Sequence, residues 1–146
     1  MRRTLIAVAA VTGAIFPSSV LAQSGPALID KLYGELEVGL RQEGIAFTPM
    51  RTIDGELSDT GEREVWIEIK GDASYGLAGM CDENCVDLDL RAIDSAGLAV
   101  ASDLGPDDQP LLDLGASPPG LYRIQTTMAD CGADRCAYSL RLYRWE

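Results

Sequence analysis

The stretch MCDENCVDLDLRAID, which runs from Met80 to Asp94, decides the fold class. From Val86 to Ala92 its residues alternate between apolar and polar. This period of two is typical of a β-strand with one buried face. We therefore expect a strand whose inward residues are Val86, Leu88, Leu90 and Ala92 and whose outward residues are Asp87, Asp89 and Arg91.

The same period of two recurs along the chain after Gly44. Turn residues separate the alternating segments, as in 58–61, 71–72, 94–97 and 117–120. Short alternating strands divided by such turns favour an antiparallel sandwich. The sequence therefore predicts an all-β domain over residues 51–146, an antiparallel jelly-roll-like β-sandwich. The apolar sets that share its inward faces are Val65, Ile67 and Ile69; Tyr122, Ile124, Thr126 and Met128; and Tyr138, Leu140 and Leu142.

One N-terminal α-helix precedes this domain. Apolar residues recur at helical spacing between residues 27 and 42, with charged residues between them. Pro26 fits the first turn of a helix, and Gly44 fits its end. Residues 23–50 are therefore predicted to form the helix and a linker, and the apolar stripe consists of Leu28, Ile29, Leu32, Leu36 and Leu40.

Residues 1–22 have the pattern of a secretory signal peptide. Arg2 and Arg3 come before an apolar run from Leu5 to Phe16, and small residues follow. The apolar run is too short to span a bilayer, so we expect cleavage after Ala22. The mature protein is then periplasmic or secreted, and no later apolar run predicts membrane insertion.

The chain is strongly acidic, with 12 basic and 23 acidic residues and a formal net charge of −11. Such a charge disfavours nucleic acids and anionic membrane surfaces, and it permits basic partners or divalent cations. The simpler alternative is that the acids keep an exported protein soluble. Histidine is absent, which excludes Ser-His and Cys-His nucleophile pairs and the usual zinc ligands.

The four cysteines form two close pairs, Cys81 with Cys85 and Cys131 with Cys136. Export favours disulfides. Each pair brackets a short connection between predicted strands, and residues that flank a hairpin loop face each other, so we favour Cys81–Cys85 and Cys131–Cys136. A crossed pairing stays open. The spacing and the oxidising compartment disfavour a zinc site, and the absence of Cys-x-x-Cys disfavours a redox role.

Acids are dense between Cys81 and Asp113, and Asp87 and Asp89 project from one face of the predicted strand. Two close carboxylates repel each other unless a positive charge lies between them, and calcium accepts several oxygen ligands in flexible geometry. The candidate ligands for Ca²⁺ are Asp82, Asp87, Asp89, Asp107 and Asp108. An ion pair with Arg91 and plain solvation are the alternatives. Two carboxylates at such a distance also suit glycoside hydrolysis, although no cleft is evident.

An ordered series of motifs resembles the bacterial pre-peptidase C-terminal domain, over about residues 52–145. The series comprises Gly55-Glu56-Leu57, Val65-Trp66-Ile67, Tyr75, Gly79-Met80-Cys81-Asp82, Cys85-Val86-Asp87-Leu88-Asp89-Leu90, Asp94-x-x-Gly97, Gly120-x-Tyr122, Cys131 and Cys136-Ala137-Tyr138. The resemblance implies a jelly-roll-like sandwich that serves as an accessory module of secreted proteases. Some relatives bind calcium or extracellular polymers, so it also implies Asp87 and Asp89 as calcium ligands. Here we expect a stand-alone secreted form.

The predicted function is that of an exported, non-enzymatic accessory or binding module, stabilised by calcium. Its partner would be a protein or an extracellular polymer, and we expect a monomer. The first alternative is an acidic inhibitor of a basic exported enzyme, which would use its charge to steer binding. The second alternative is a small carboxylate-dependent hydrolase.

Overall fold

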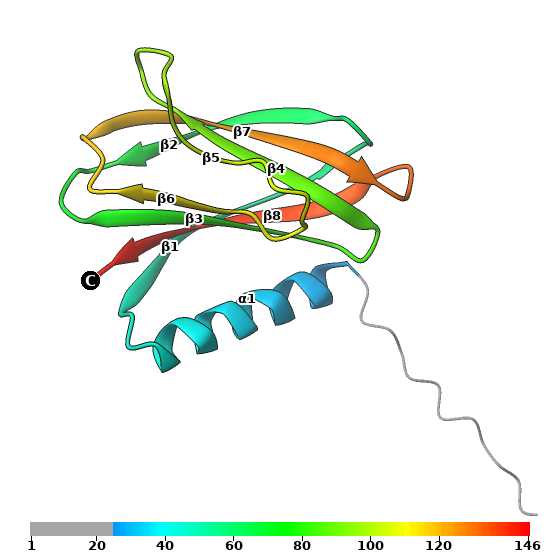
Figure 1. The fold of residues 1–146 in the computed structure, drawn as a ribbon, viewed down its shortest axis with the longest axis horizontal. Coiled ribbons are helices and arrows are strands. Elements are labelled where there is room, and N and C mark those ends of the chain that lie inside the picture. The colour runs from blue at the N-terminus through cyan, green and yellow to red at the C-terminus, as the bar shows by residue number, and fades with distance from the viewer. Residues whose placement is uncertain (1–24) are drawn as a thin grey trace, which may run out of the picture.

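The computed structural model describes residues 25–146 and shows an all-β protein with one N-terminal helix (Figure 1). The predicted signal peptide, residues 1–22, lies outside the described residues. The elements are α1 (Pro26–Gln42), β1 (Phe47–Leu57), β2 (Glu62–Ile69), β3 (Ser74–Cys81), β4 (Cys85–Ile93), β5 (Ala99–Asp103), β6 (Leu111–Gly115), β7 (Gly120–Cys131) and β8 (Cys136–Trp145).

The strands form two four-stranded antiparallel sheets, in the orders β1-β8-β3-β6 and β2-β7-β4-β5. Only β4 and β5 are consecutive strands of one sheet, and every other connection crosses to the opposite sheet. This order is that of an eight-stranded jelly roll with two Greek keys. The predicted sandwich is therefore confirmed.

The inward faces of the two sheets form one apolar core. The alternation predicted in β4 holds for Leu88, Leu90 and Ala92, whose side chains are fully buried. Val86 is the exception, because 56% of it is exposed. The pairing of β4 with β7 shifts register between Cys85 and Asp87, so the chain bulges at Val86 and turns its side chain outward.

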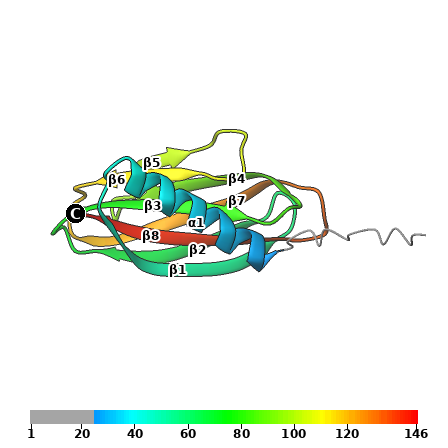
Figure 2. The same ribbon diagram turned by 90° about the horizontal axis from the view of Figure 1, so that it is seen from below.

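Helix α1 lies across the outer face of the β1-β8-β3-β6 sheet (Figure 2). Ile29 and Tyr33 are its buried residues, and they pack on Ala78, Met80 and Tyr143. Strand β3 is therefore covered on both sides and is buried along almost its whole length. Within residues 25–146, no helix is both long enough and apolar enough to cross a bilayer.

The helix ends where the sequence predicts. Gly44 has a φ of 77°, its N–H donates to the Arg41 carbonyl, and the Ile45 N–H donates to the Leu40 carbonyl. A positive φ after the last turn favours glycine. Strand β1 then begins at Phe47, ahead of the expected start of the sandwich at residue 51. It does so because β8 continues to Trp145 and pairs with Phe47 there.

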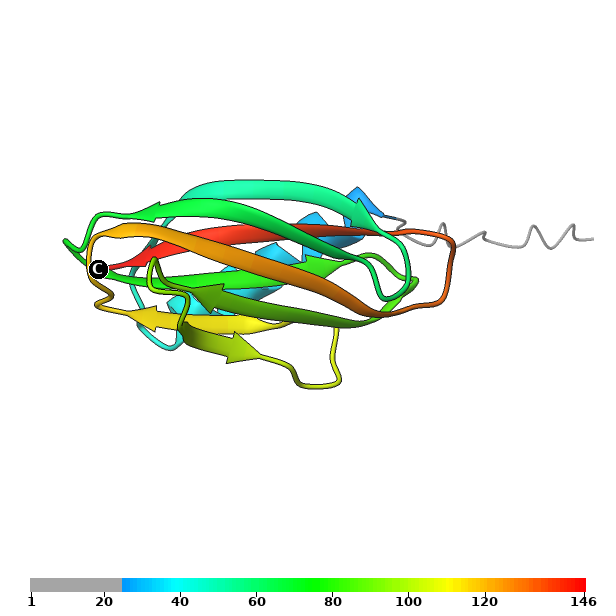
Figure 3. The ribbon, with the colours of Figure 1, turned by 90° about the horizontal axis from the view of Figure 1, so that it is seen from above.

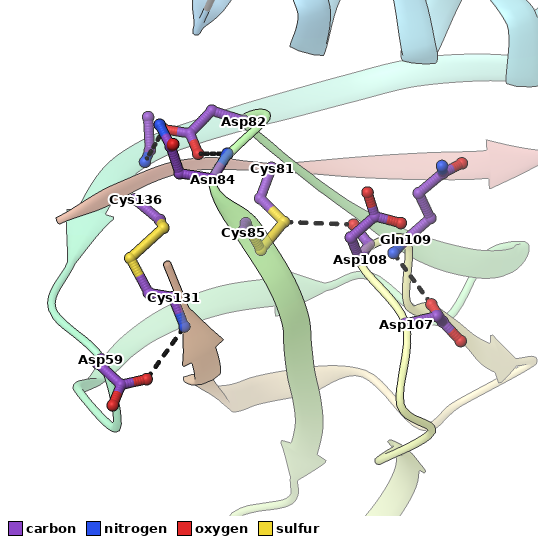
Figure 4. Close-up of a disulfide and its surroundings, with 11 residues drawn as sticks. Asp59, Cys81, Asp82, Asn84, Cys85, Asp107, Asp108, Gln109, Cys131 and Cys136 are labelled. Carbon is purple, nitrogen blue, oxygen red and sulfur yellow. Dashed lines mark hydrogen bonds between the residues drawn. A yellow bond between two sulfur atoms is a disulfide. The ribbon is translucent and has the colours of Figure 1, made fainter. Parts of the chain in front are cut away.

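The two disulfides pair as predicted, Cys81 with Cys85 and Cys131 with Cys136. The expected reason, a hairpin, is wrong, because β3 and β4 belong to opposite sheets and so do β7 and β8. Each disulfide therefore joins the two sheets at a corner, over Cα distances of 5.9 and 6.0 Å. Figure 4 shows the two bonds at the same end of the sandwich.

Candidate functional site

The outer face of the β2-β7-β4-β5 sheet is the candidate functional site, and we call it the open face. Helix α1 covers the other sheet, so in Figure 3 the open face lies toward the viewer and the helix lies behind. Strand pairing and burial define its side chains. They are Glu62, Glu64, Trp66 and Glu68 of β2, Leu121, Arg123, Gln125 and Thr127 of β7, and Asp87, Asp89 and Arg91 of β4.

The β2 and β7 side of the open face is joined by contacts between side chains. Arg123 forms an ion pair with Glu64 at 3.2 Å, and Gln125 and Thr127 both donate to Glu62. Trp66 lies opposite Arg123 in the strand pairing, and 54% of it is exposed. This side therefore presents a large aromatic side chain among polar groups that are already paired.

The β4 side of the open face carries two carboxylates, those of Asp87 and Asp89. One oxygen each of Asp87 and Asp89 is buried and makes no hydrogen bond within the described residues. Burial raises the pKa of Asp87, and the charges of Asp107 and Asp130 raise it further. Burial also raises the pKa of Asp89, as does the charge of Asp87, while Arg91 acts in the opposite direction. A positive group bound to the open face would therefore stabilise the charged forms of these two carboxylates.

The other predicted calcium ligands have mostly structural contacts (Figure 4). The Asp82 carboxylate is buried and accepts from the N–H groups of Asn84 and Ala137, at 3.1 and 2.6 Å. Asp107 accepts from the Gln109 N–H at 3.0 Å, and the Asp108 carbonyl oxygen lies 3.4 Å from the Cys81 Sγ. Asp82 thus closes the turn between β3 and β4.

The structure brings Asp87 near both Asp89 and Asp107, and it places Asp82 in the disulfide corner. Among residues 25–146, no group of three or more Asp, Glu, His or Cys side chains is arranged to hold a metal ion. The five residues therefore do not fit a ready-made calcium site. Calcium binding at the Asp87 and Asp89 pair stays a prediction that needs further oxygen ligands from water.

Asp130 was not among the predicted site residues, yet it lies opposite Asp87 where β4 pairs with β7. These two residues are far apart in the chain, and only the strand order of the jelly roll brings them together. Asp103 belongs to the acid-rich stretch between Cys81 and Asp113, but nothing in the sequence links it to Asp89. Its proximity to Asp89 depends on the pairing of β4 with β5.

A hollow of about 190 Å³ lies on the open face beside Asp89, Glu62 and Arg91. Pockets for small ligands typically measure about 300–1,000 Å³. The hollow is smaller than that range, and Asp87 does not line it. The predicted pair of catalytic carboxylates, Asp87 and Asp89, on either side of a bound sugar is therefore not supported by this geometry.

No family model matches the chain, and no curated protein matches it. Among solved structures, it is similar to a periplasmic inhibitor of g-type lysozyme from Aeromonas hydrophila, with 13% identity, a TM-score of 0.42, and coverage of 71% of this chain and 90% of that one. It is also similar to a dTDP-6-deoxy-D-glucose-3,5-epimerase from Legionella pneumophila, with 9% identity, a TM-score of 0.38, and coverage of 75% and 56%. These similarities are too weak to carry an argument about this chain.

Proposed function

We propose that the protein is an exported, non-enzymatic binding module that docks a basic protein partner on the open face. The observation that carries this proposal is the imbalance of charge on the face that α1 leaves uncovered. It has five carboxylates, Glu62, Glu64, Glu68, Asp87 and Asp89, against the two guanidinium groups of Arg91 and Arg123.

The energetics of Asp87 and Asp89 favour a cationic partner. Each carboxylate has a buried oxygen that forms no hydrogen bond with any residue in 25–146, and each lies near other negative charges. A lysine or arginine side chain of the partner would offset the negative charge of this pair and relieve the repulsion. The exposed indole of Trp66 adds an aromatic anchor, the type of side chain that dominates many protein interfaces.

Export is supported by the predicted signal peptide and by the two disulfides, which leave no free cysteine. Disulfides persist in oxidising compartments. A periplasmic or secreted protein with this charge would attract basic proteins from a distance and bind them faster at low salt. An inhibitor of a basic exported enzyme is the specific form of this function that the charge favours.

We also propose the pre-peptidase C-terminal type as the family of the domain. Two of the motifs that support this proposal lie in neighbouring strands: the Asp87-Leu88-Asp89-Leu90 segment lies in β4, and the Gly120-x-Tyr122 segment begins β7. Asp94 begins the turn between β4 and β5, where its carboxylate accepts from the N–H groups of Ala96 and Leu98.

Affinity capture tests the binding function. The immobilised protein is exposed to the exported proteins of its source cells at low and high salt, beside an Asp87→Asn, Asp89→Asn variant and a Trp66→Ala variant. Glu35→Gln is the matched control, because Glu35 is an exposed acid on α1, away from the open face. We expect a basic protein that the wild type and the control retain at low salt and that the other variants lose. Equal retention by all four proteins would contradict the proposal.

A further inference from the structure

The free edge of strand β2 is the most regular edge of the sandwich. Among residues 25–146, the strands that end the two sheets are β1 and β6 in one sheet and β2 and β5 in the other. Strands β5 and β6 have five residues each, and β1 contains Pro49 with a register shift beside it. Strand β2 has eight residues, which pair one to one with β7 and include neither proline nor glycine. A regular exposed edge of this kind can accept a further strand.

Two hydrogen bonds show which backbone groups of β2 point away from β7. The Arg51 guanidinium of β1 donates to the Trp66 carbonyl at 3.0 Å, from outside the β2-β7-β4-β5 sheet. The carbonyl of Gly61, just before the strand, instead accepts from an N–H of β7 at 2.9 Å. These directions alternate along an antiparallel strand. The N–H and C=O groups of Glu64, Trp66 and Glu68 therefore lie on the free edge.

The same residues direct acidic and aromatic side chains to the open face. Glu64 and Glu68 lie on either side of Trp66, and Glu62 precedes them with the same orientation. In an added strand, a residue opposite one of these would have its side chain on the same face of the sheet. Opposite charges in such cross-strand pairs are favourable. A strand with lysine or arginine at alternate positions therefore matches the charge of this edge.

The other face of an added strand would meet the inward side of β1. Figure 3 shows β1 and β2 along the same side of the sandwich. Ile53 of β1 pairs with the core residue Leu140, so its side chain points toward the interior, where it is only partly buried. Apolar residues between the basic ones would cover Ile53. The segment that fits this edge therefore alternates basic and apolar residues.

A second copy of this chain fits the edge poorly. Pairing of β2 with β2 of another copy would bring Glu62, Glu64 and Glu68 of both chains onto one face, where their charges repel. Arg51 also occupies the Trp66 carbonyl, and charged side chains at an edge are a common protection against self-association. The charge of the edge thus favours a basic strand from a different protein.

We propose that β2 binds its partner by strand addition. An extended segment with alternating basic and apolar residues pairs antiparallel with residues 64–68, the slightly more stable direction of pairing. It displaces the Arg51 guanidinium from the Trp66 carbonyl, and its basic side chains lie beside Glu64 and Glu68. This inference rests on the proposed function, because it specifies how a basic partner binds the open face.

The test is an NMR titration of the purified protein with the acetylated and amidated peptide Lys-Val-Lys-Val-Lys-Val-Lys. We expect shifts centred on β2 and slower hydrogen exchange of the Glu64 and Glu68 N–H groups. In antiparallel pairing the lysine N–H groups face β2 and the valine N–H groups face away. A peptide that is N-methylated at its lysines should therefore bind at least about tenfold more weakly than one that is N-methylated at its valines. Equal affinity of these two peptides, or no shift in β2 at millimolar peptide, would overturn the proposal.

Variants at the edge locate the added strand. Glu68→Pro and Glu68→Gln remove the same charge, but only proline removes the N–H on the free edge, and it leaves the ladder with β7 intact. Glu68→Pro should bind the peptide at least about tenfold more weakly than Glu68→Gln. Arg51→Ala frees the Trp66 carbonyl and should strengthen binding about threefold. Equal affinity of the two Glu68 variants would contradict strand addition.

Capture of the partner separates this inference from the proposed function. A basic exported protein that Glu68→Pro and Glu68→Gln retain equally would overturn strand addition and leave docking on the open face intact. Absence of any captured basic protein would instead remove the proposed function. Retention by Glu68→Gln together with loss by Glu68→Pro is the result that we expect.

Discussion

Cys85 and Cys131 are Cα partners on the neighbouring strands β4 and β7, so the two disulfides stand side by side at one end of the sandwich. One bond links Cys85 to Cys81 of β3 and the other links Cys131 to Cys136 of β8, and both β3 and β8 belong to the opposite sheet. The two bonds therefore form one clamp that fastens the sheets together, although each closes only a short loop.

Removal of one bond of this clamp should have a moderate cost. We expect the double variant Cys81→Ala, Cys85→Ala to lose about 2 kcal/mol of unfolding free energy, the amount that loop entropy gives for so short a loop. Because the bonds are neighbours, loss of both should differ from the sum of the separate losses. Urea unfolding measures the free energy lost in each variant. If the loss on removal of both disulfides equals the sum of the two separate losses, the bonds do not act as one clamp.

Tyr33 should hold the helix on the sheet. Its hydroxyl lies 2.8 Å from the Ser139 carbonyl oxygen and 3.1 Å from that of Ala78, and its single proton is shared between these two acceptors. We expect Tyr33→Phe to cost about 1 to 2 kcal/mol, because it leaves buried carbonyl groups without that donor. Thermal unfolding is the measurement. Glu35→Gln on the exposed side of α1 is the control and should change little, and an equal effect of the two substitutions would refute this role.

Stability should depend on pH through Asp87 and Asp89. Their pKa values are raised in the folded protein, so the folded state holds protons that the unfolded state has released. Stability therefore falls as pH rises from the ordinary carboxyl pKa of 3.8 through the folded pKa values, and the full penalty is present above them. Asp87→Asn should be more stable than the wild type at neutral pH, and this gain should vanish as pH falls below 3.8. A gain that is constant over this range would argue against the raised pKa.

Much of the fold could be predicted from local patterns. The alternation of Leu88, Leu90 and Ala92 and the helical spacing in α1 both reflect burial of one face, which the sequence records directly. Val86 could not be placed correctly, because the bulge that turns it outward depends on the pairing with β7. The buried position of Tyr33 was also missed, because the predicted apolar stripe of the helix contained only aliphatic residues, although Tyr33 follows Ile29 by one helical turn.

The candidate site was predicted less completely than the fold. Asp87 and Asp89 share a strand, so their proximity follows from the period of two. Asp130 joins them only through the pairing of β7 with β4, and Asp82 leaves the group because backbone amides occupy its carboxylate. The sequence alone identifies the acidic residues of the site. It does not show which of them the strand pairing brings together and which it separates.

Calcium should bind weakly if it binds to the open face. The Asp87 and Asp89 carboxylates offer four oxygens between them, fewer than the six to eight ligands that calcium takes, so we expect a dissociation constant on the order of a millimolar. Calorimetric titration, together with melting curves with calcium and with a chelator, measures this. The Asp87→Asn, Asp89→Asn variant should lose both the heat of binding and the shift in melting temperature. A wild type that shows neither response would contradict calcium binding at Asp87 and Asp89.

If a basic partner docks on the open face, hydrogen exchange on the complex with the captured protein should locate the contact there. We predict slower exchange along β2, β7 and β4, centred on Trp66, Asp87 and Asp89, and no change in α1. The added protection should disappear at high salt, because the attraction depends on charge. Protection confined to α1 and β1, or protection that high salt leaves intact, would contradict docking of a basic partner on the open face.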